Sequence, residues 1–196
     1  MIGRLAGRLL LKQPPLLLID VGGVGYEVEA PMSTFYKLPA VGETVALHTH
    51  LTVREDAHLL FGFATATEKS LFRELIRISG VGPKLALAIL SGMGVDEFWI
   101  TVRAGDAMRL TKLPGVGRKT ADRLIVEMRD RADRADLTPV LPGAGSVDAT
   151  PLQDARHALA ALGYKPVEIQ RFTEAVYKDG MNTEQIIQEA LKRAVR

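Results

Sequence analysis

Two copies of a short glycine turn, starting 35 residues apart, constrain the fold of this 196-residue chain more than any other feature. The copies are residues 79–84 (SGVGPK) and residues 114–119 (PGVGRK). Each one follows a stretch with apolar residues at helical spacing and precedes a basic residue that opens another helical stretch. The repeat therefore predicts two helix-hairpin-helix units in one all-α segment.

The residue types of the repeat suit phosphate binding. Glycine allows a tight backbone turn and a close approach to another surface, because it has no Cβ. The amides after the turn lie at a helix N-terminus, where they lack intrahelical partners and the helix dipole favours an anion. We therefore expect sequence-independent, salt-dependent binding of nucleic acid. The predicted DNA-binding residues are Ser79, Gly80, Val81, Gly82, Lys84, Gly115, Val116, Gly117, Arg118, Lys119 and Arg123.

Other interpretations of the glycines fit less well. A single Gly-Val-Gly turn could be a plain helix C-cap, but two copies with following basic residues argue against this. A P-loop with residue 117 as its last glycine would need a glycine at position 112 and a lysine at position 118. These positions are Lys and Arg, so residues 115–120 (GVGRKT) are not a P-loop. The glycines at positions 22, 23 and 25 lie between strand-like runs and indicate a hairpin turn rather than a dinucleotide loop. No ATP site is predicted.

The charge distribution supports the same location for a polyanion. The chain has a net charge of +2, but residues 65–135 contain 13 basic and 9 acidic side chains, whereas residues 1–64 and 136–196 are each at −1.

The chain has no cysteine, which excludes disulfides, thiolate metal sites and a cysteine nucleophile. Its first apolar runs are too short to span a membrane. We expect a cytoplasmic protein.

Residues 1–64 have the pattern of a small antiparallel barrel. About five strand-like runs, with glycine and proline at the bends, predict a closed barrel of the OB type, with an open sheet or an SH3-like barrel as alternatives. The run of residues 45–63 is interrupted by Arg54, Glu55 and Asp56, which predicts a hairpin with a charged tip. A solvent-exposed turn often contains Asp and Glu without any function.

The rest of the chain has helical periodicity with one interruption. Residues 65–136 are expected to form the all-α domain, with Asp96 and Asp106 as N-caps. Residues 137–150 contain prolines and glycines but no Lys or Arg, and indicate a flexible linker. Residues 151–196 predict three short helices, with Thr150 capping the first, Pro151 at its first position and Asn182 capping the last.

Several side chains allow both a structural and a functional interpretation. His48, His50 and His58 lie on neighbouring strands, but no carboxylate or thiol accompanies them, so we predict no metal site. Phe98 and Trp99 are expected in the core. Four apolar residues of the last domain could belong to its core or to a docking surface: Leu159, Leu162, Tyr164 and Leu191.

The whole chain outside residues 137–150 resembles the RuvA family, the Holliday-junction-binding subunits of bacterial branch-migration complexes. The resemblance rests on an ordered set of segments: residues 1–7 (MIGRLAG), 54–57, 59–63, 80–93, 113–117, 123–128 and 161–166. It implies a multi-domain α+β protein with an OB-type barrel, a double helix-hairpin-helix domain and a three-helix, UBA-like bundle. Glu55 and Asp56 look like the acidic pin of this family.

The resemblance also implies a function and partners. It predicts a non-catalytic subunit without cofactor that binds four-way DNA junctions as a homotetramer, with an octamer on DNA as an alternative, in recombination and repair. The last domain would dock on the hexameric ATPase RuvB, and the resolvase RuvC would join a larger complex. Two other classes stay open: a helix-hairpin-helix nuclease or glycosylase, for which no metal-spaced carboxylates are evident, and a general duplex-binding architectural protein.

Overall fold

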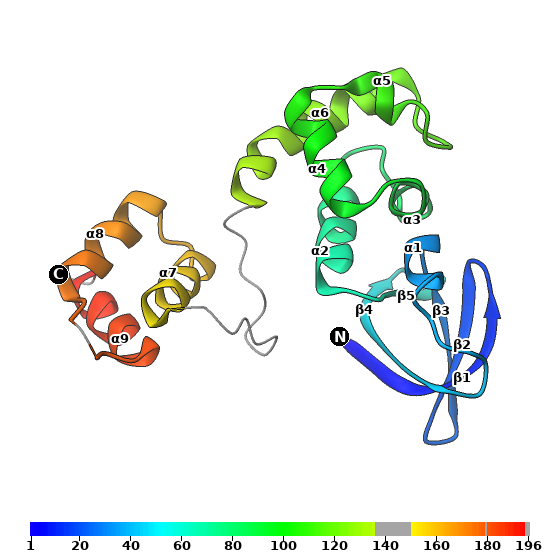
Figure 1. Ribbon diagram of the computed structural model, residues 1–196, viewed down its shortest axis with the longest axis horizontal. Helices are drawn as coiled ribbons and strands as arrows, with labels where there is room; N and C mark the ends of the chain where they lie inside the picture. Colours follow the sequence, from blue (N-terminus) through cyan, green and yellow to red (C-terminus); the bar gives the residue numbers. More distant parts are fainter. Residues whose placement is uncertain (136–149, 179, 195–196) are drawn as a thin grey trace. The chain divides into compact units, whose positions relative to one another are not determined.

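The structure is a computed structural model that describes residues 1–135, 150–178 and 180–194. The chain divides into two compact units, residues 1–135 and 136–196. All of the expected linker except Thr150 lies outside the described residues. Figure 1 shows a barrel and a group of helices in the first unit, and a smaller group of helices in the second.

The first unit begins with a closed barrel. Its neighbouring strands follow the order β1-β2-β3-β5-β4, and the ring closes by antiparallel pairing of β4 with β1. The remaining neighbours are also antiparallel except β3 and β5, which pair in parallel at Glu29 and Phe61. The closed ring confirms the predicted OB-type barrel and excludes an open sheet. The strands are β1 (Arg4–Gln13), β2 (Leu16–Val21), β3 (Val24–Glu29), β4 (Thr44–Val53) and β5 (His58–Phe63).

Alternating side chains fill the barrel. Leu9, Leu17, Ile19 and Val28 are fully buried, while their sequence neighbours face outward or are partly covered. The turn between β2 and β3 uses Gly22 and Gly23 at φ 63° and 90°, as predicted for a hairpin. The sequence did not predict helix α1 (Met32–Phe35), because four residues are too few for a helical period to show.

Five helices follow the barrel in the first unit. Asp106 caps α5 as predicted, since its side chain accepts a hydrogen bond from the amide of Arg109 at 3.0 Å. The prediction for Asp96 was wrong: Gly94 is the N-cap of α4, and Asp96 lies in the first turn. The helices are α2 (Ala66–Leu75), α3 (Pro83–Gly92), α4 (Val95–Ala104), α5 (Ala107–Leu110) and α6 (Arg118–Ala135).

The barrel and these helices share packing. Phe61 and Phe63 project from β5 onto Phe72 of α2, with ring centroids 5.0 and 4.9 Å apart. The buried Glu68 of α2 accepts hydrogen bonds from the Thr34 hydroxyl at 3.2 Å and the Ala64 amide at 3.1 Å. A boundary between two separate domains at residue 64 therefore stays a prediction.

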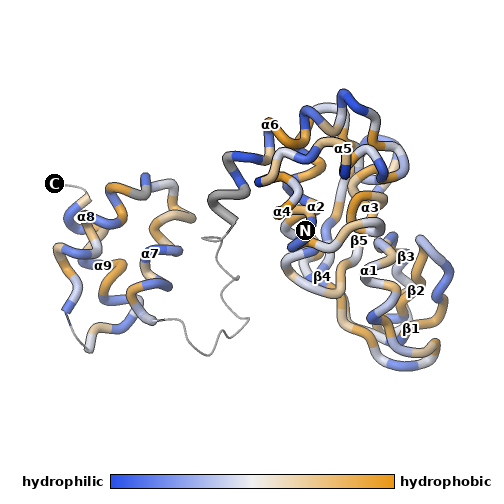
Figure 2. Tube along the Cα trace, turned by 45° about the horizontal axis from the view of Figure 1, so that its top comes forward, coloured by the Kyte–Doolittle hydropathy of each residue, from blue (hydrophilic) through white to orange (hydrophobic). Residues whose placement is uncertain are grey.

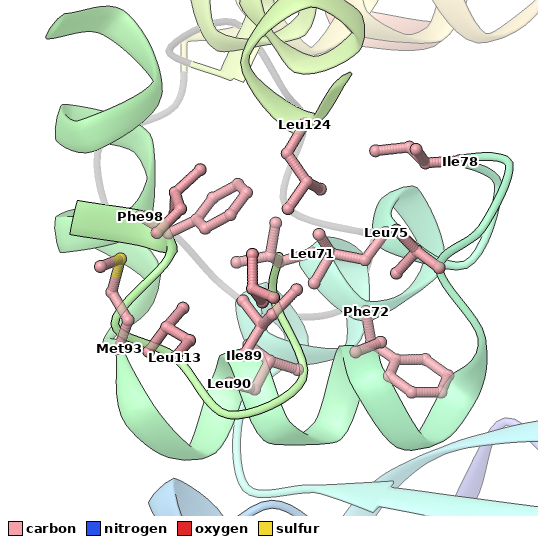
Figure 3. Close-up of a cluster of buried hydrophobic side chains, with 14 of the residues drawn as sticks. Leu71, Phe72, Leu75, Ile78, Ile89, Leu90, Met93, Phe98, Leu113 and Leu124 are labelled. Atoms are coloured by element: carbon pink, nitrogen blue, oxygen red, sulfur yellow. The ribbon is translucent and has the colours of Figure 1, made fainter. Parts of the chain in front are cut away.

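One apolar cluster holds the helices of the first unit together. Side chains from α2, α3, α4 and α6 point toward one another in its centre (Figure 3). Phe98 is fully buried there, as expected, and Trp99 packs against the cluster from its edge. Hydrophobic and hydrophilic positions alternate along α6 (Figure 2), and Ala121, Leu124 and Met128 of this helix belong to the buried cluster. Both glycine turns are thus fixed to one core.

The second unit is a bundle of three helices, as predicted. Thr150 caps the first helix by accepting from the Gln153 amide at 3.4 Å, and Asn182 caps the last by accepting from the Gln185 amide at 2.9 Å. Buried residues from all three helices form its core. The helices are α7 (Pro151–Ala161), α8 (Pro166–Val176) and α9 (Thr183–Ala194).

Within the ranges that the structure describes, no single helix has the length and hydropathy to cross a membrane. Only α3 and α4 taken together reach them, as a pair bent by 96°.

Candidate nucleic-acid interface

The first glycine turn joins α2 to α3. Gly80 has φ +88°, a left-handed conformation that L side chains rarely adopt. The next residue, Val81, turns its side chain into the core, and its amide donates to the carbonyl oxygen of Ile78 at 3.0 Å. Gly82 is the N-cap of α3, and Pro83 occupies the first helical position. The turn therefore reverses the chain and exposes the N-terminus of α3.

The second turn, between α5 and α6, repeats this geometry. Gly115 has φ +80°, and the Val116 amide donates to the carbonyl oxygen of Leu113 at 3.1 Å. In both turns the last glycine accepts the first helical hydrogen bond: Ala86 donates to Gly82 at 3.0 Å and Ala121 to Gly117 at 2.9 Å. The two copies of the repeat thus form two equivalent hairpins.

Each hairpin presents unpaired backbone donors to the outside. The amides before the first helical hydrogen bond have no partner within their helix. On the second hairpin these include the amides of Gly117, Arg118 and Lys119, whereas Pro83 removes one donor from the first. Together with the positive end of the helix dipole, such donors bind a phosphate or another anion.

The predicted basic side chains differ in their surroundings. Lys84 and Lys119 are exposed, and neither has an ion-pair partner among the side chains that the structure describes. Arg118 is also exposed, but its Nε lies 3.4 Å from Oδ2 of Asp122 on the next turn of α6. The two lysines are therefore available to an anionic ligand without breaking a contact.

Arg123, predicted as a DNA-binding residue, contacts other protein groups in the structure. Its Nη1 donates to the carbonyl oxygen of Ser79 at 2.7 Å, and its Nε lies 3.9 Å from Oε1 of Glu127. Because Ser79 belongs to the first hairpin and Arg123 to α6, this hydrogen bond joins the two hairpins. Sequence reasoning missed this role, since the two residues are 44 positions apart.

The valines of the repeat contribute only their backbone to the exposed surface. The side chains of Val81 and Val116 are 4% and 5% exposed. They anchor the turns in the core, and cannot themselves contact a ligand. Ser79 and the four predicted glycines are exposed.

The charged tip lies where the sequence predicted it. The amide of Arg54 donates to the carbonyl oxygen of Ala57 at 2.8 Å and closes the turn between β4 and β5. Glu55 and Asp56 are exposed at the end of this turn. Their carboxylates therefore project from the barrel, opposite in charge to the hairpins.

Three histidines lie on neighbouring strands: His48 and His50 on β4, and His58 on β5. In the part of the chain that the structure describes, no group of three or more His, Cys, Asp or Glu side chains could hold a metal ion. His50 packs against the ring of Phe72, with centroids 5.7 Å apart. Burial, together with the charges of Arg73 and Lys69, lowers the pKa of His50.

The four candidate docking residues of the second unit have different environments. Leu159 is fully buried in the bundle core, so the structure contradicts its place on a docking surface. Tyr164 and Leu191 are half-buried against that core. Leu162 is 62% exposed, and Val167 at the start of α8 is 80% exposed, although the sequence did not single it out. The sequence signal that could have identified Val167 was its position directly after Pro166, at the start of a helix.

Three family models match the chain. The model of the RuvA N-terminal domain matches residues 1–62, a SAM-like helix-hairpin-helix tandem matches residues 72–130, and the RuvA C-terminal domain matches residues 150–195. The tandem covers both hairpins, and the first model covers the barrel with its acidic tip.

Similar proteins span the whole chain. The chain is 54% identical over 201 residues to a protein of Pseudomonas aeruginosa (strain UCBPP-PA14) and 55% identical over 201 residues to one of Thioalkalivibrio sulfidiphilus, each alignment covering 100% of both sequences. A protein of Pseudomonas syringae pv. syringae is 54% identical over 98% of both. All three are named Holliday junction branch migration complex subunit RuvA. With two equivalent hairpins on an OB-type barrel and full-length relatives of this similarity, the chain belongs to the RuvA family.

Proposed function

We propose that the protein binds four-way DNA junctions through their phosphate backbones and acts as the non-catalytic DNA-binding subunit of a branch-migration complex. The main support is the pair of equivalent hairpins, whose helix N-termini are exposed and held in one core. Two such sites can bind two phosphate stretches of one duplex arm. Such contacts position DNA without selecting a base sequence.

The acidic tip gives this DNA binder a second element. In a homotetramer, Glu55 and Asp56 from four chains would meet at the crossover of the junction. A carboxylate and a phosphate about 4 Å apart repel each other by about 1 to 4 kcal/mol, depending on the effective dielectric constant. This repulsion would keep the exchanging strands apart and mobile, so the hairpins could hold the arms without freezing the crossover. Neutral substitutions at both positions should tighten junction binding or change migration speed.

The second unit is the proposed contact with the motor. In this proposal the ATPase RuvB supplies the force, since no ATP-binding sequence is evident in this chain, and RuvC resolvase joins a larger complex in the cytoplasm. An octamer of two tetramers around the junction is the alternative assembly to one tetramer. Leu162 and Val167 support the docking role, because both are apolar and exposed on the bundle.

Competition binding tests the DNA-binding proposal. The purified protein is incubated with a labelled four-way junction in the presence of Mg²⁺ and either unlabelled junction or unlabelled linear duplex of the same sequence. We expect the junction to compete far better, and the labelled strands to stay intact. Equal competition would favour a general architectural protein, and strand cleavage or base release would favour a nuclease or glycosylase.

A surface substitution tests the docking proposal. Leu162→Ser should leave junction binding unchanged and reduce stimulation of RuvB ATPase activity, because the side chain is outside the core. Gln170→Ser, on an exposed polar position of α8, is the control. Full stimulation by the Leu162 variant would remove this residue from the docking surface.

A further inference from the structure

A cluster of basic groups lies outside both hairpins, where β4 faces α2. Lys69 and Arg73 are four residues apart on α2 and therefore share one helix face. Phe72 lies between them in sequence, and its ring contacts the imidazole of His50 on β4. The cluster is thus formed by Lys69, Arg73 and His50, from two elements that pack together.

The charges of this cluster are not compensated. Burial and the charge of Arg73 lower the pKa of Lys69, and burial, Arg73 and Lys69 lower that of His50. Lys69 uses one of its donors on the carbonyl oxygen of Gly3 at 3.0 Å. Among the described side chains, neither Lys69 nor Arg73 forms an ion pair.

Neighbouring cations of the same region are neutralised. Arg77, four residues beyond Arg73, lies 3.0 Å from the Glu74 carboxylate, which also pairs with Arg131. Lys37 lies 3.6 Å from Glu68. Concentrating like charges costs folding energy, so an uncompensated basic cluster beside paired cations indicates a site for an anion.

The groups around His50 leave it without a carboxylate partner. On its own strand His48 and Thr52 are the nearest residues of the same face, and Phe61 of β5 is its partner in register. From α2 it faces the charges of Lys69 and Arg73, while Glu68 is turned to Thr34 and Lys37. An incoming anion would therefore add a negative charge beside an imidazole on which cations act.

The two elements that form the cluster are followed in sequence by proposed DNA-contacting features: β4 by the acidic tip, and α2 by the first hairpin. His50 precedes Glu55 at the acidic tip by five residues, about 17 Å of extended strand. Arg73 lies two residues before the end of α2 and seven residues before Gly80 of the first hairpin. We propose that Lys69, Arg73 and His50 form a third binding site for a DNA backbone phosphate, on the path between the first hairpin and the acidic tip. This inference rests on the proposed junction binding.

A phosphate at this site would make binding depend on pH. The imidazolium form of His50 is favoured by a nearby phosphate, so its pKa rises on binding and the complex takes up a proton. Because burial and the charges of Arg73 and Lys69 hold the pKa of free His50 below its usual value, affinity should increase as the pH falls from neutral into the acidic range.

The salt dependence of junction affinity tests the two permanent cations. Each phosphate contact adds about 0.9 to the magnitude of the slope of log K against log salt concentration. We expect Lys69→Gln and Arg73→Gln to lower that magnitude by about 0.9 each. Arg8→Gln is the control, because Arg8 is an exposed cation of the same barrel, and its β4 partner Thr44 lies six residues, about 20 Å, from His50. Its slope should equal that of the wild type.

His50→Gln tests the pH dependence. The variant should lose the gain in affinity that the wild type shows as the pH falls below neutral, while its affinity at neutral pH stays near that of the wild type. Unchanged slopes for both the Lys69 and the Arg73 variants, or an equal decrease for Arg8→Gln, would overturn the third site while leaving junction binding intact. A wild-type protein that does not prefer the junction would instead overturn the proposed function.

Discussion

The two hairpins have the same turn but different supports. The first follows the ten-residue α2, which packs on the barrel, and the second follows α5, which has only four residues. The first opens a ten-residue helix through Pro83, and the second opens the eighteen-residue α6 through Arg118. The local sequence thus produces one turn geometry in two tertiary settings.

This difference indicates that the two hairpins contribute differently to DNA binding. The second hairpin has one more amide donor and one more basic side chain, so we expect it to contribute more of the affinity. The first hairpin is fixed to the barrel, so it would hold bound DNA at a set position relative to the acidic tip. Arg123 joins the two through the Ser79 carbonyl.

The largest expected effect is on the free energy of unfolding, and it should differ between the positive-φ glycines of the two hairpins. An alanine at a positive φ costs about 1 to 2 kcal/mol. A Cβ at Gly115 would also lie 3.1 Å from Cδ1 of Leu85, whereas at Gly80 the nearest neighbour is Nη1 of Arg123 at 3.7 Å. We expect Gly115→Ala to lower the free energy of unfolding by about 2 kcal/mol and Gly80→Ala by about 1 kcal/mol, measured by urea denaturation.

Gly117→Ala is the matched control for this pair. Its φ is not in the left-handed range, and a Cβ there would meet nothing within 4 Å. Its free energy of unfolding should stay within about 0.5 kcal/mol of the wild type. A Gly80 variant that loses as much stability as the Gly115 variant would show that the two settings do not differ.

The next effect concerns the unpaired lysines. We expect Lys84→Gln and Lys119→Gln each to reduce the salt-dependence slope of junction binding by about 0.9, because each removes one phosphate contact. Lys12→Gln is a suitable control, since that side chain donates to the Leu38 carbonyl of the barrel. A change at only one hairpin would mean that the other does not contact DNA.

The smallest effect tests the link between the hairpins. Arg123→Gln removes the hydrogen bond to Ser79, which we expect to lower the free energy of unfolding by about 1 kcal/mol. If Arg123 positions the hairpins, junction affinity falls but the slope of its salt dependence stays unchanged. A decrease of about 0.9 in that slope would instead assign Arg123 a direct phosphate contact.

Much of the fold could be predicted because its signals are local. Thr150, Asn182 and Asp106 cap helices as expected, since a cap depends on residues within one turn. The failure at Asp96 has a local cause as well: the N-cap is Gly94, two residues earlier, and an acidic residue is equally favourable in the first turn. Leu159 was ambiguous because an apolar residue on a helix stripe can face a core or a partner.

The sequence alone determined the two hairpins and the acidic tip, because each is formed by a few consecutive residues whose chemistry requires that turn. Only the tertiary structure decided that Arg123 binds the first hairpin and that His50 packs on α2, where the charges of Lys69 and Arg73 act on it. These pairings join residues far apart in the chain. Their geometry follows from the packing of whole elements around shared cores, which no local pattern specifies.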